Sequence, residues 1–196
     1  MKAPIRSGED RRSALVAAAY HQIAQRGFEG LRTREVADEV GVNVATLHYY
    51  FPTKEKLIEG VVARAMGRFR TTLDAGGDSG DLLGRYLRGT RRLLADEPEL
   101  AAVMGELAMR SARDPALARI MQNMNEGWHK AVRGMLRRAA REGQIARELD
   151  ADPVAALIVS VLASMSLPRS GIRTSQAMHQ LERWLDGAAA KARSSN

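Results

Sequence analysis

Residues 33–51 read TREVADEVGVNVATLHYYF, and this stretch predicts two short helices joined by a tight turn. Thr33 is the expected N-cap of the first helix, and Asn43 is the expected N-cap of the second. Gly41 follows the last apolar residue of the first helix, where a helix end needs a residue that tolerates positive φ. The small side chain of Ala37 lets the second helix cross the first closely and steeply. The stretch therefore predicts a helix-turn-helix.

The two predicted helices have an inward and an outward face. We expect the inward apolar residues to lock the pair together and to seat it on a third helix; these are Val36, Val40, Val42, Leu47 and Tyr50. The second helix then presents Val44, Ala45, Thr46, His48 and Tyr49 outward. Taken alone, the stretch also fits an αα-hairpin in an all-helical protein that binds no DNA.

Composition sets the class of protein but says little about its partner. The chain has 196 residues and a net charge of +7. Residues 1–64 carry ten Lys and Arg against eight Asp and Glu, so the basic excess is not concentrated around the predicted helix-turn-helix. The chain contains no cysteine, which excludes disulfides and thiolate metal sites. The N-terminus lacks an apolar signal region, and the apolar run 154–168 is too short for a membrane span, so we expect a cytoplasmic protein without a membrane partner.

Helical periodicity continues along the rest of the chain, with no alternating strand pattern. The expected helices are 9–25, 33–40, 44–51, one that begins after Thr53, 81–95, 98–111, 115–142, 153–167 and 175–192. In the last part of the chain, Pro98, Pro115 and Pro153 each follow an acidic residue, which is the expected order of cap and proline at a helix start. Nine helices predict an all-α fold.

Residues 11–62 resemble the DNA-binding domain of TetR-family (tetracycline-repressor-like) transcriptional regulators. The matching residues are the Ala-rich first helix ending in Arg26-Gly27-Phe28, then Leu31-Arg32-Thr33, Val36-Ala37, Gly41-Val42, Thr46-Leu47-His48-Tyr49-Tyr50-Phe51 and Lys54-Glu55-Lys56-Leu57. Asn43 and His48 depart from the family's usual Ser or Thr and Tyr. Residues 1–8 are expected to form a flexible arm. The resemblance implies a DNA-binding domain at 9–62 that helix four joins to the rest, and a helical effector-binding and dimerisation domain at 63–196.

A recognition helix reads base edges in the major groove from its exposed N-terminal residues. Thr46 offers a hydroxyl and a methyl group, and Val44 and Ala45 offer apolar contact. The hydroxyls of Tyr49 and Tyr50 suit phosphates, although Tyr50 also fits a core position. The full set of expected DNA contacts is Thr33, Arg34, Val44, Ala45, Thr46, His48, Tyr49, Tyr50 and Lys54.

The C-terminal part has two apolar features, a methionine-rich stripe and a pair of apolar helix faces, to which the family resemblance assigns functions. A methionine-rich stripe with one tryptophan is typical of a plain core, and the resemblance implies that it lines a site for a small, largely apolar effector: Met104, Leu107, Met121, Met124 and Trp128. The last two helices carry apolar faces that suit a dimer interface: Leu157, Ile158, Val161, Leu162, Met165, Met178, Leu181 and Leu185. The alternative is that both helices are the core of a monomer.

Rival functions have less support in the sequence. No histidine lies in a metal-binding pattern, and no nucleophile elbow or cofactor motif occurs, so we expect no enzyme, no metal and no cofactor. A helical adaptor that has lost specific DNA binding is the main alternative, and a membrane-surface helix at 133–147 is a weaker one. The sequence favours a homodimeric regulator of transcription, more readily a repressor than an activator, that binds a palindromic operator in double-stranded DNA.

Overall fold

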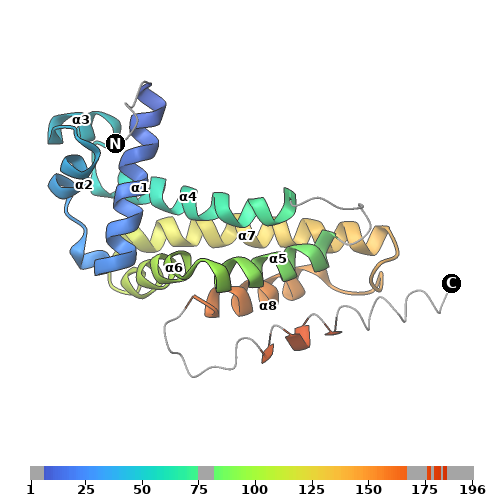
Figure 1. The fold of residues 1–196 in the computed structure, drawn as a ribbon. Helices are drawn as coiled ribbons and strands as arrows, with labels where there is room; N and C mark the ends of the chain where they lie inside the picture. The colour runs from blue at the N-terminus through green and yellow to red at the C-terminus, as the bar shows by residue number, and fades with distance from the viewer. Residues whose placement is uncertain (1–6, 75–81, 167–175, 178, 182, 185–196) are drawn as a thin grey trace. The chain divides into compact units, whose positions relative to one another are not determined.

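The computed structural model describes residues 7–74, 82–166, 176–177, 179–181 and 183–184. Within these residues the chain forms eight α-helices and one 3₁₀ helix, and no strand, which confirms the all-α prediction (Figure 1). In chain order they are α1 (Gly8–Arg26), η1 (Phe28–Gly30), α2 (Thr33–Val40), α3 (Val44–Tyr50), α4 (Lys54–Asp74), α5 (Leu82–Asp96), α6 (Pro98–Ser111), α7 (Pro115–Arg141) and α8 (Ala151–Ser164). Most of the predicted ninth helix, 175–192, lies outside the described residues.

The chain divides into two compact units. Unit 1 contains residues 1–67 together with 102–121, and unit 2 contains residues 68–101 together with 122–196. Helices α4, α6 and α7 each contribute residues to both units. The boundary expected from the sequence lies after residue 62, whereas unit 1 also includes most of α6 and the first turns of α7.

Unit 1 has its core beneath the first three helices. α1 contacts α2 and η1, and α2 contacts α3. Leu15 and Ile23 of α1 are fully buried, as are Val36 of α2 and Leu47 of α3. Val40, Val42 and Tyr50, which were also expected to face inward, are half-buried. The apolar spacing read from the sequence therefore yields the helix-turn-helix as a packed body.

Local chemistry sets the ends of these helices. Ser7 and Asp10 form a capping box at the start of α1, with 3.0 Å from the Asp10 N–H to Ser7 Oγ. Gly41 ends α2 in the left-handed conformation with φ +77°, as predicted. The prediction that Thr33 caps α2 is wrong. Arg32 occupies the cap position and makes no side-chain capping bond, so Thr33 is the first helical residue.

Unit 2 packs the last turns of α4 with α5, α7 and α8 (Figure 1). The ring of Phe69 on α4 lies 5.2 Å from that of Trp128 on α7, measured between centroids. α4 and α5 approach so closely that a Cβ atom on Gly89 would lie 2.9 Å from Thr72 Cβ. None of the described helices has both the length and the hydropathy needed to cross a membrane.

The start of α8 differs from the prediction. Asp152 was expected to cap a helix that begins at Pro153, but Asp150 is the cap and accepts a hydrogen bond from the Asp152 N–H at 3.1 Å. The Asp152 carboxylate instead accepts a hydrogen bond from Arg133 on α7 at 2.8 Å. This bond holds the pKa of Asp152 below its ordinary value and fastens the first turn of α8 to α7. α8 also ends earlier than expected, so Met165 follows the helix.

Candidate nucleic-acid interface

α3 has one buried and one exposed side. Leu47 is 1% exposed, while Tyr49 is 81% exposed. Ala45 and His48 are exposed as well, and Val44, Thr46 and Tyr50 are half-buried. A phenol ring standing this far into solvent on a seven-residue helix contributes nothing to the core. Its free surface is available to a partner.

The start of α3 is fixed by Asn43, as the sequence predicted. Its side-chain oxygen accepts hydrogen bonds from the Thr46 N–H at 2.7 Å and from Thr46 Oγ1 at 2.9 Å. The hydroxyl proton of Thr46 is therefore already used. What Thr46 offers to a base is its methyl group and the lone pairs of its oxygen.

The two tyrosines of α3 have different surroundings. Their rings meet edge to face with centroids 5.2 Å apart. The Tyr50 hydroxyl lies against the first turn of α1, because a Cβ atom on Gly8 would be 3.3 Å from it. Tyr50 thus supports the position of α3, whereas Tyr49 is the ring that faces solvent.

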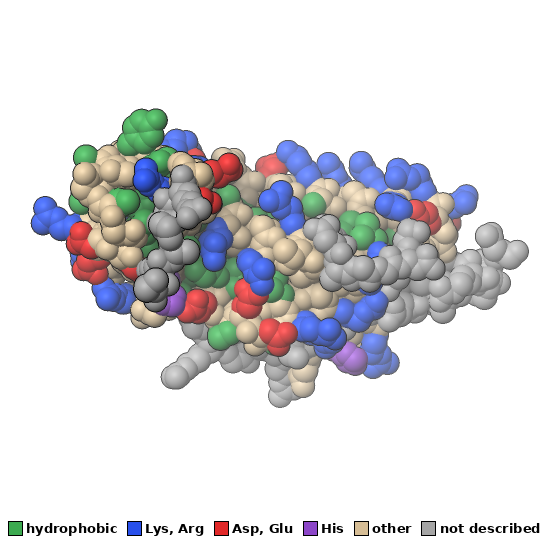
Figure 2. Space-filling model, turned by 45° about the horizontal axis from the view of Figure 1, so that its top comes forward, with side chains coloured by type: hydrophobic (Ala, Val, Ile, Leu, Met, Phe, Trp, Pro, Cys, Tyr) green, Lys and Arg blue, Asp and Glu red, His purple; other side chains and the backbone are tan. Residues whose placement is uncertain are grey.

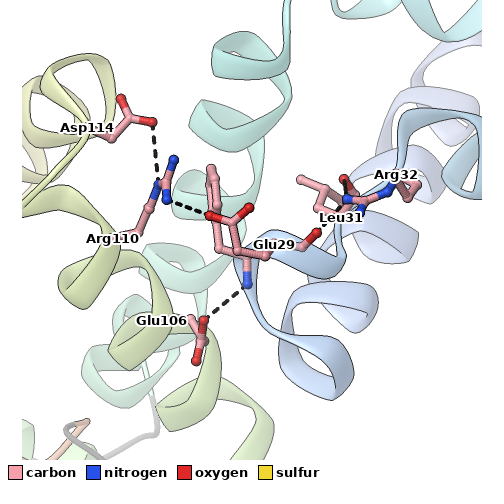
Figure 3. A network of polar contacts seen from close by, with 7 residues as sticks. Glu29, Leu31, Arg32, Glu106, Arg110 and Asp114 are labelled. Atoms are coloured by element: carbon pink, nitrogen blue, oxygen red, sulfur yellow. Dashed lines mark hydrogen bonds and ion pairs between the residues drawn. The ribbon is translucent and has the colours of Figure 1, made fainter.

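The N-terminus of α2 is open. Side-chain oxygens cap α1, α3 and α4, in the last case through the Lys56 N–H and Thr53 Oγ1 at 3.3 Å, but no side chain caps α2. Its first N–H groups can therefore donate hydrogen bonds to an anion, and the exposed Arg34 lies in the same turn as Thr33. The Arg32 guanidinium donates to the backbone oxygens of Glu29 and Leu31 and so stays beside the preceding loop (Figure 3).

The amine of Lys54, which was expected to contact a phosphate, lies over an aromatic ring of the protein itself. Its Nζ is 4.5 Å from the centroid of the Phe28 ring. Burial lowers the pKa of Lys54 from its ordinary value. The side chain also lines a small cavity of about 150 Å³ together with Phe28, Glu29, Glu55, Ile58, Arg110, Asp114, Leu117 and Ile120.

Around this cavity a polar network ties η1 to the end of α6. Glu106 accepts a hydrogen bond from the Phe28 N–H at 3.1 Å, and Arg110 pairs with Glu29 and with Asp114 (Figure 3). Sequence reasoning missed this network, because ion pairs between residues about eighty positions apart leave no periodic signal. The network therefore connects η1, which precedes α2, to α6 within unit 1.

Charge does not single out the helix-turn-helix. On the face shown in Figure 2, basic side chains are spread over the molecule and stand among acidic ones. Arg26 of α1, for example, is paired with Glu35 of α2. The interface is therefore distinguished by the shape and exposure of α3 rather than by a basic patch.

The residues expected to bind an effector fall into both units. Met104, Leu107 and Met121 belong to unit 1, while Met124 and Trp128 belong to unit 2. All are buried except Met124, which is half-buried. None of these five residues lines the cavity at Lys54. None of them lines a groove of about 410 Å³ beside Arg85, Arg88 and Arg92 either.

The residues expected at a dimer interface also differ in exposure. Leu157 on α8 is 44% exposed, and Val161 and Met165 are half-buried. Ile158, Leu162 and Leu181 are buried within the protomer. Met178 and Leu185 lie outside the described residues. Ala156 and Ser160 are exposed next to Leu157, so α8 has an uncharged face turned to solvent.

Comparison with known proteins decides the family. Residues 15–61 match the family described as bacterial regulatory proteins, tetR family, and residues 73–181 match the tetracyclin repressor-like C-terminal domain. The second match alone covers more than half of the chain. The chain belongs to the TetR family.

The relatives of this TetR-family chain match it over very different shares of their length. A Rhodococcus protein described as a TetR-family transcriptional regulator is 28% identical, with a TM-score of 0.75 over 91% of this chain and 98% of that one. The transcriptional repressor KstR2 of Mycobacterium tuberculosis is 23% identical over 74% of each chain. The nucleoid occlusion factor SlmA of Pasteurella multocida is 36% identical over 64 residues, so the match spans only 32% of that relative.

Family membership settles the class of activity. TetR-family proteins are regulators of transcription with a DNA-binding helix-turn-helix, and this chain is one of them rather than an enzyme. The helix-turn-helix that defines the family is α2, the turn at Gly41 and α3. Family membership does not say which residues of this TetR-family regulator contact DNA, an effector or a partner subunit.

Proposed function

We propose that this TetR-family regulator is a homodimeric repressor in the cytoplasm that binds a palindromic operator through α3. A small, largely apolar effector releases it from the DNA. The observation that carries the DNA contact is the exposed face of α3, with Tyr49 at its centre. A helix that buries one face and presents a largely exposed aromatic ring on the other is suited to enter the major groove of DNA.

The DNA contacts divide into two groups in this proposal. Val44, Ala45, Thr46 and His48 reach base edges in the major groove, where Thr46 and Ala45 favour a thymine methyl group. Tyr49, together with Thr33 and Arg34 at the open end of α2, binds phosphates on either side. Tyr50 holds α3 in place through its contact with the first turn of α1. Lys54 binds a phosphate only after its amine moves away from the Phe28 ring.

The proposal includes a dimer because the DNA contact made by a single α3 helix is small. One seven-residue helix reads only a few base pairs, and two helices held a helical turn or more apart read an inverted repeat. The solvent-facing side of α8, with Leu157 and Val161, provides a self-complementary surface for a two-fold axis. The buried Ile158 and Leu162 shape this surface from beneath.

The effector part of the proposal rests on the buried methionine-rich residues. Methionine adapts to irregular shapes, and Trp128 supplies a flat wall in unit 2. An effector that binds one arrangement of the recognition helices more tightly than another shifts the population away from the DNA-binding form. Without such a difference in affinity, binding would leave the operator occupied.

Fluorescence anisotropy on DNA that flanks the protein's own gene tests the proposal. We expect saturable binding that survives excess non-specific DNA and weakens steeply as salt is raised. A scrambled duplex of the same composition serves as the control. Binding that is equal on the scrambled duplex, or no binding at all, would instead favour an adaptor that has lost specific DNA recognition.

A further inference from the structure

The cavity of unit 1 at Lys54 is separate from the residues proposed to bind the effector, none of which lines it. It measures about 150 Å³. Its apolar lining comes from Phe28 of η1, Ile58 of α4 and Leu117 of α7, which are buried, and from the half-buried Ile120. An apolar protein cavity of about this volume takes up benzene. The cavity therefore has room for a small molecule the size of one aromatic ring.

Two cationic side chains at this cavity have N–H groups without a hydrogen-bond acceptor. The Lys54 ammonium, 4.5 Å from the centroid of the Phe28 ring, forms no hydrogen bond and no ion pair with the residues that the structure describes. The Arg110 guanidinium lies 5.4 Å from the same centroid, and its buried Nε–H has no acceptor among the described groups. A donor that is shielded from water and has no acceptor costs folding free energy, so both groups favour a ligand that accepts hydrogen bonds.

The acidic residues that line the cavity do not supply this acceptor. Glu29 pairs with Nη1 of Arg110, whereas Asp114 Oδ2 lies 3.9 Å from Nε, which is too far for a hydrogen bond. Asp114 Oδ1 instead accepts from two N–H groups in the first turn of α7, at 3.1 Å each. Glu55 is exposed, and a hydrogen bond with Thr53 holds its pKa below the ordinary value. All three carboxylates are therefore engaged with other groups.

The charge around Lys54 favours an acceptor that is an anion. Burial and two neighbouring arginines lower the pKa of Lys54 by more than Glu29 and Asp114 raise it. The ammonium thus lacks a compensating charge, although acidic residues outnumber basic ones in the lining. A carboxylate in the cavity would compensate the ammonium and would also accept from the Arg110 Nε–H. A neutral molecule would supply the acceptor without the charge.

We propose that the cavity binds a small carboxylic acid with one apolar ring. Lys54 and Arg110 bind its carboxylate, and Phe28, Ile58 and Leu117 contact the ring. This site goes beyond the proposed function, because the effector proposed there contacts other residues. The binding of the acid can be tested whether or not the protein binds an operator.

Two probes of the same size test the need for a negative charge. Benzoate carries a carboxylate where benzamide carries a neutral amide, and the ring is the same. Isothermal titration calorimetry of the full chain should show saturable binding of benzoate, about tenfold or more tighter than binding of benzamide. In ¹⁵N-labelled protein, benzoate should shift the Arg110 Nε–H signal. The Nε–H signal of Arg138, which is bonded to Glu142, is the internal reference and should stay in place.

Variants of two lysines assign the preference to this cavity. Lys54→Met removes the ammonium and keeps a flexible side chain beside the Phe28 ring. The preference for benzoate should then fall to about twofold or less, since the other cation, Arg110, is already paired with Glu29. Lys56→Met is the matched control. It makes the same change two residues further along α4, where the lysine is exposed and paired with an acid of its own helix, and it should keep the full preference.

A change of the cavity wall provides a test that leaves both cations in place. Ile120→Trp should fill the cavity from its half-buried side, so neither probe should bind. This variant decides the matter if Lys54→Met does not fold, which urea unfolding shows. No binding of benzoate, equal affinities for the two probes, no shift of the Arg110 signal, or unchanged benzoate binding by Ile120→Trp would each overturn the inference.

Discussion

At the scale of single residues, a substitution of Tyr49 should affect DNA binding without affecting the stability of the fold. Its side chain is 81% exposed, so Tyr49→Ala should leave the urea midpoint unchanged. Loss of one contact in each half-site should weaken operator affinity by about 10- to 100-fold. Met109→Ala, which removes another exposed side chain of unit 1, is the control and should bind DNA normally. If Tyr49→Ala unfolds the protein or binds as well as wild type, the assigned role of this residue is wrong.

Lys54 gives a second prediction at this scale, with a defined pH dependence. Its pKa is lowered in the folded state, so the unfolded chain binds more protons between that lowered value and 10.5, and the stability contributed by this group rises with pH across that window. Lys54→Met should therefore cost no stability at neutral pH, since Met also packs on the Phe28 ring. Urea unfolding at neutral and alkaline pH checks this. A destabilised variant at neutral pH would show that the cation on the ring outweighs the burial of the charge.

The residue scale also shows what the sequence could and could not predict. Asn43 as a cap and Gly41 at positive φ follow from backbone geometry that only certain residues satisfy, and both are confirmed. Thr33 as a cap was wrong because Thr33 is already the first helical residue, and Arg32 before it occupies the cap position without a side-chain capping bond. The placement of Lys54 over Phe28 depends on a loop and a helix end that meet only in the folded chain.

At the scale of elements, the turn between α2 and α3 depends on one backbone conformation. A side chain on Gly41 would meet nothing within 4 Å, but its φ of +77° strains any residue with a Cβ. Gly41→Ala should lower the free energy of unfolding by about 1 kcal/mol. Gly134→Ala, in open space within α7, should raise it by about 0.5–1 kcal/mol. Both are measured by urea unfolding at one protein concentration, and equal effects of the two changes would contradict this account of the turn.

Elements with strong periodicity were the easiest to predict. α2, α6 and the start of α3 coincide with the expected ranges, because apolar spacing and end signals agree there. α8 starts two residues before the expected position, since Asp150 and Asp152 are equally good caps in sequence. Only the folded chain shows that Asp152 is held by Arg133 of α7.

At the scale of the whole molecule, the proposed dimer depends on the exposed face of α8. Leu157→Arg should place a charge at the two-fold axis, so sedimentation should show monomers and operator binding should weaken strongly. Met109→Arg introduces the same charge at an exposed position on α6 and should leave the dimer intact. A Leu157→Arg protein that stays dimeric would place the interface elsewhere.

The whole-molecule scale is also where the sequence was least informative. The all-α fold and the family follow from the helix-turn-helix motif and the run of helices. The inclusion of residues 102–121 in unit 1 does not, because it arises from contacts such as Phe28 with Glu106. The hydrogen bond from the Trp128 indole N–H to the Tyr86 hydroxyl was hidden for the same reason, since the sequence shows Trp128 only as part of an apolar stripe.

Selection of bound duplexes from a random DNA pool tests whether a dimer binds its operator through α3. We predict enrichment of an inverted repeat whose half-sites lie about 10 base pairs or more apart, centre to centre, as two α3 helices on a two-fold axis require. Tyr49→Ala should select the same repeat with weaker affinity. Enrichment of a single, unrepeated half-site, or no enrichment over the starting pool, would contradict it.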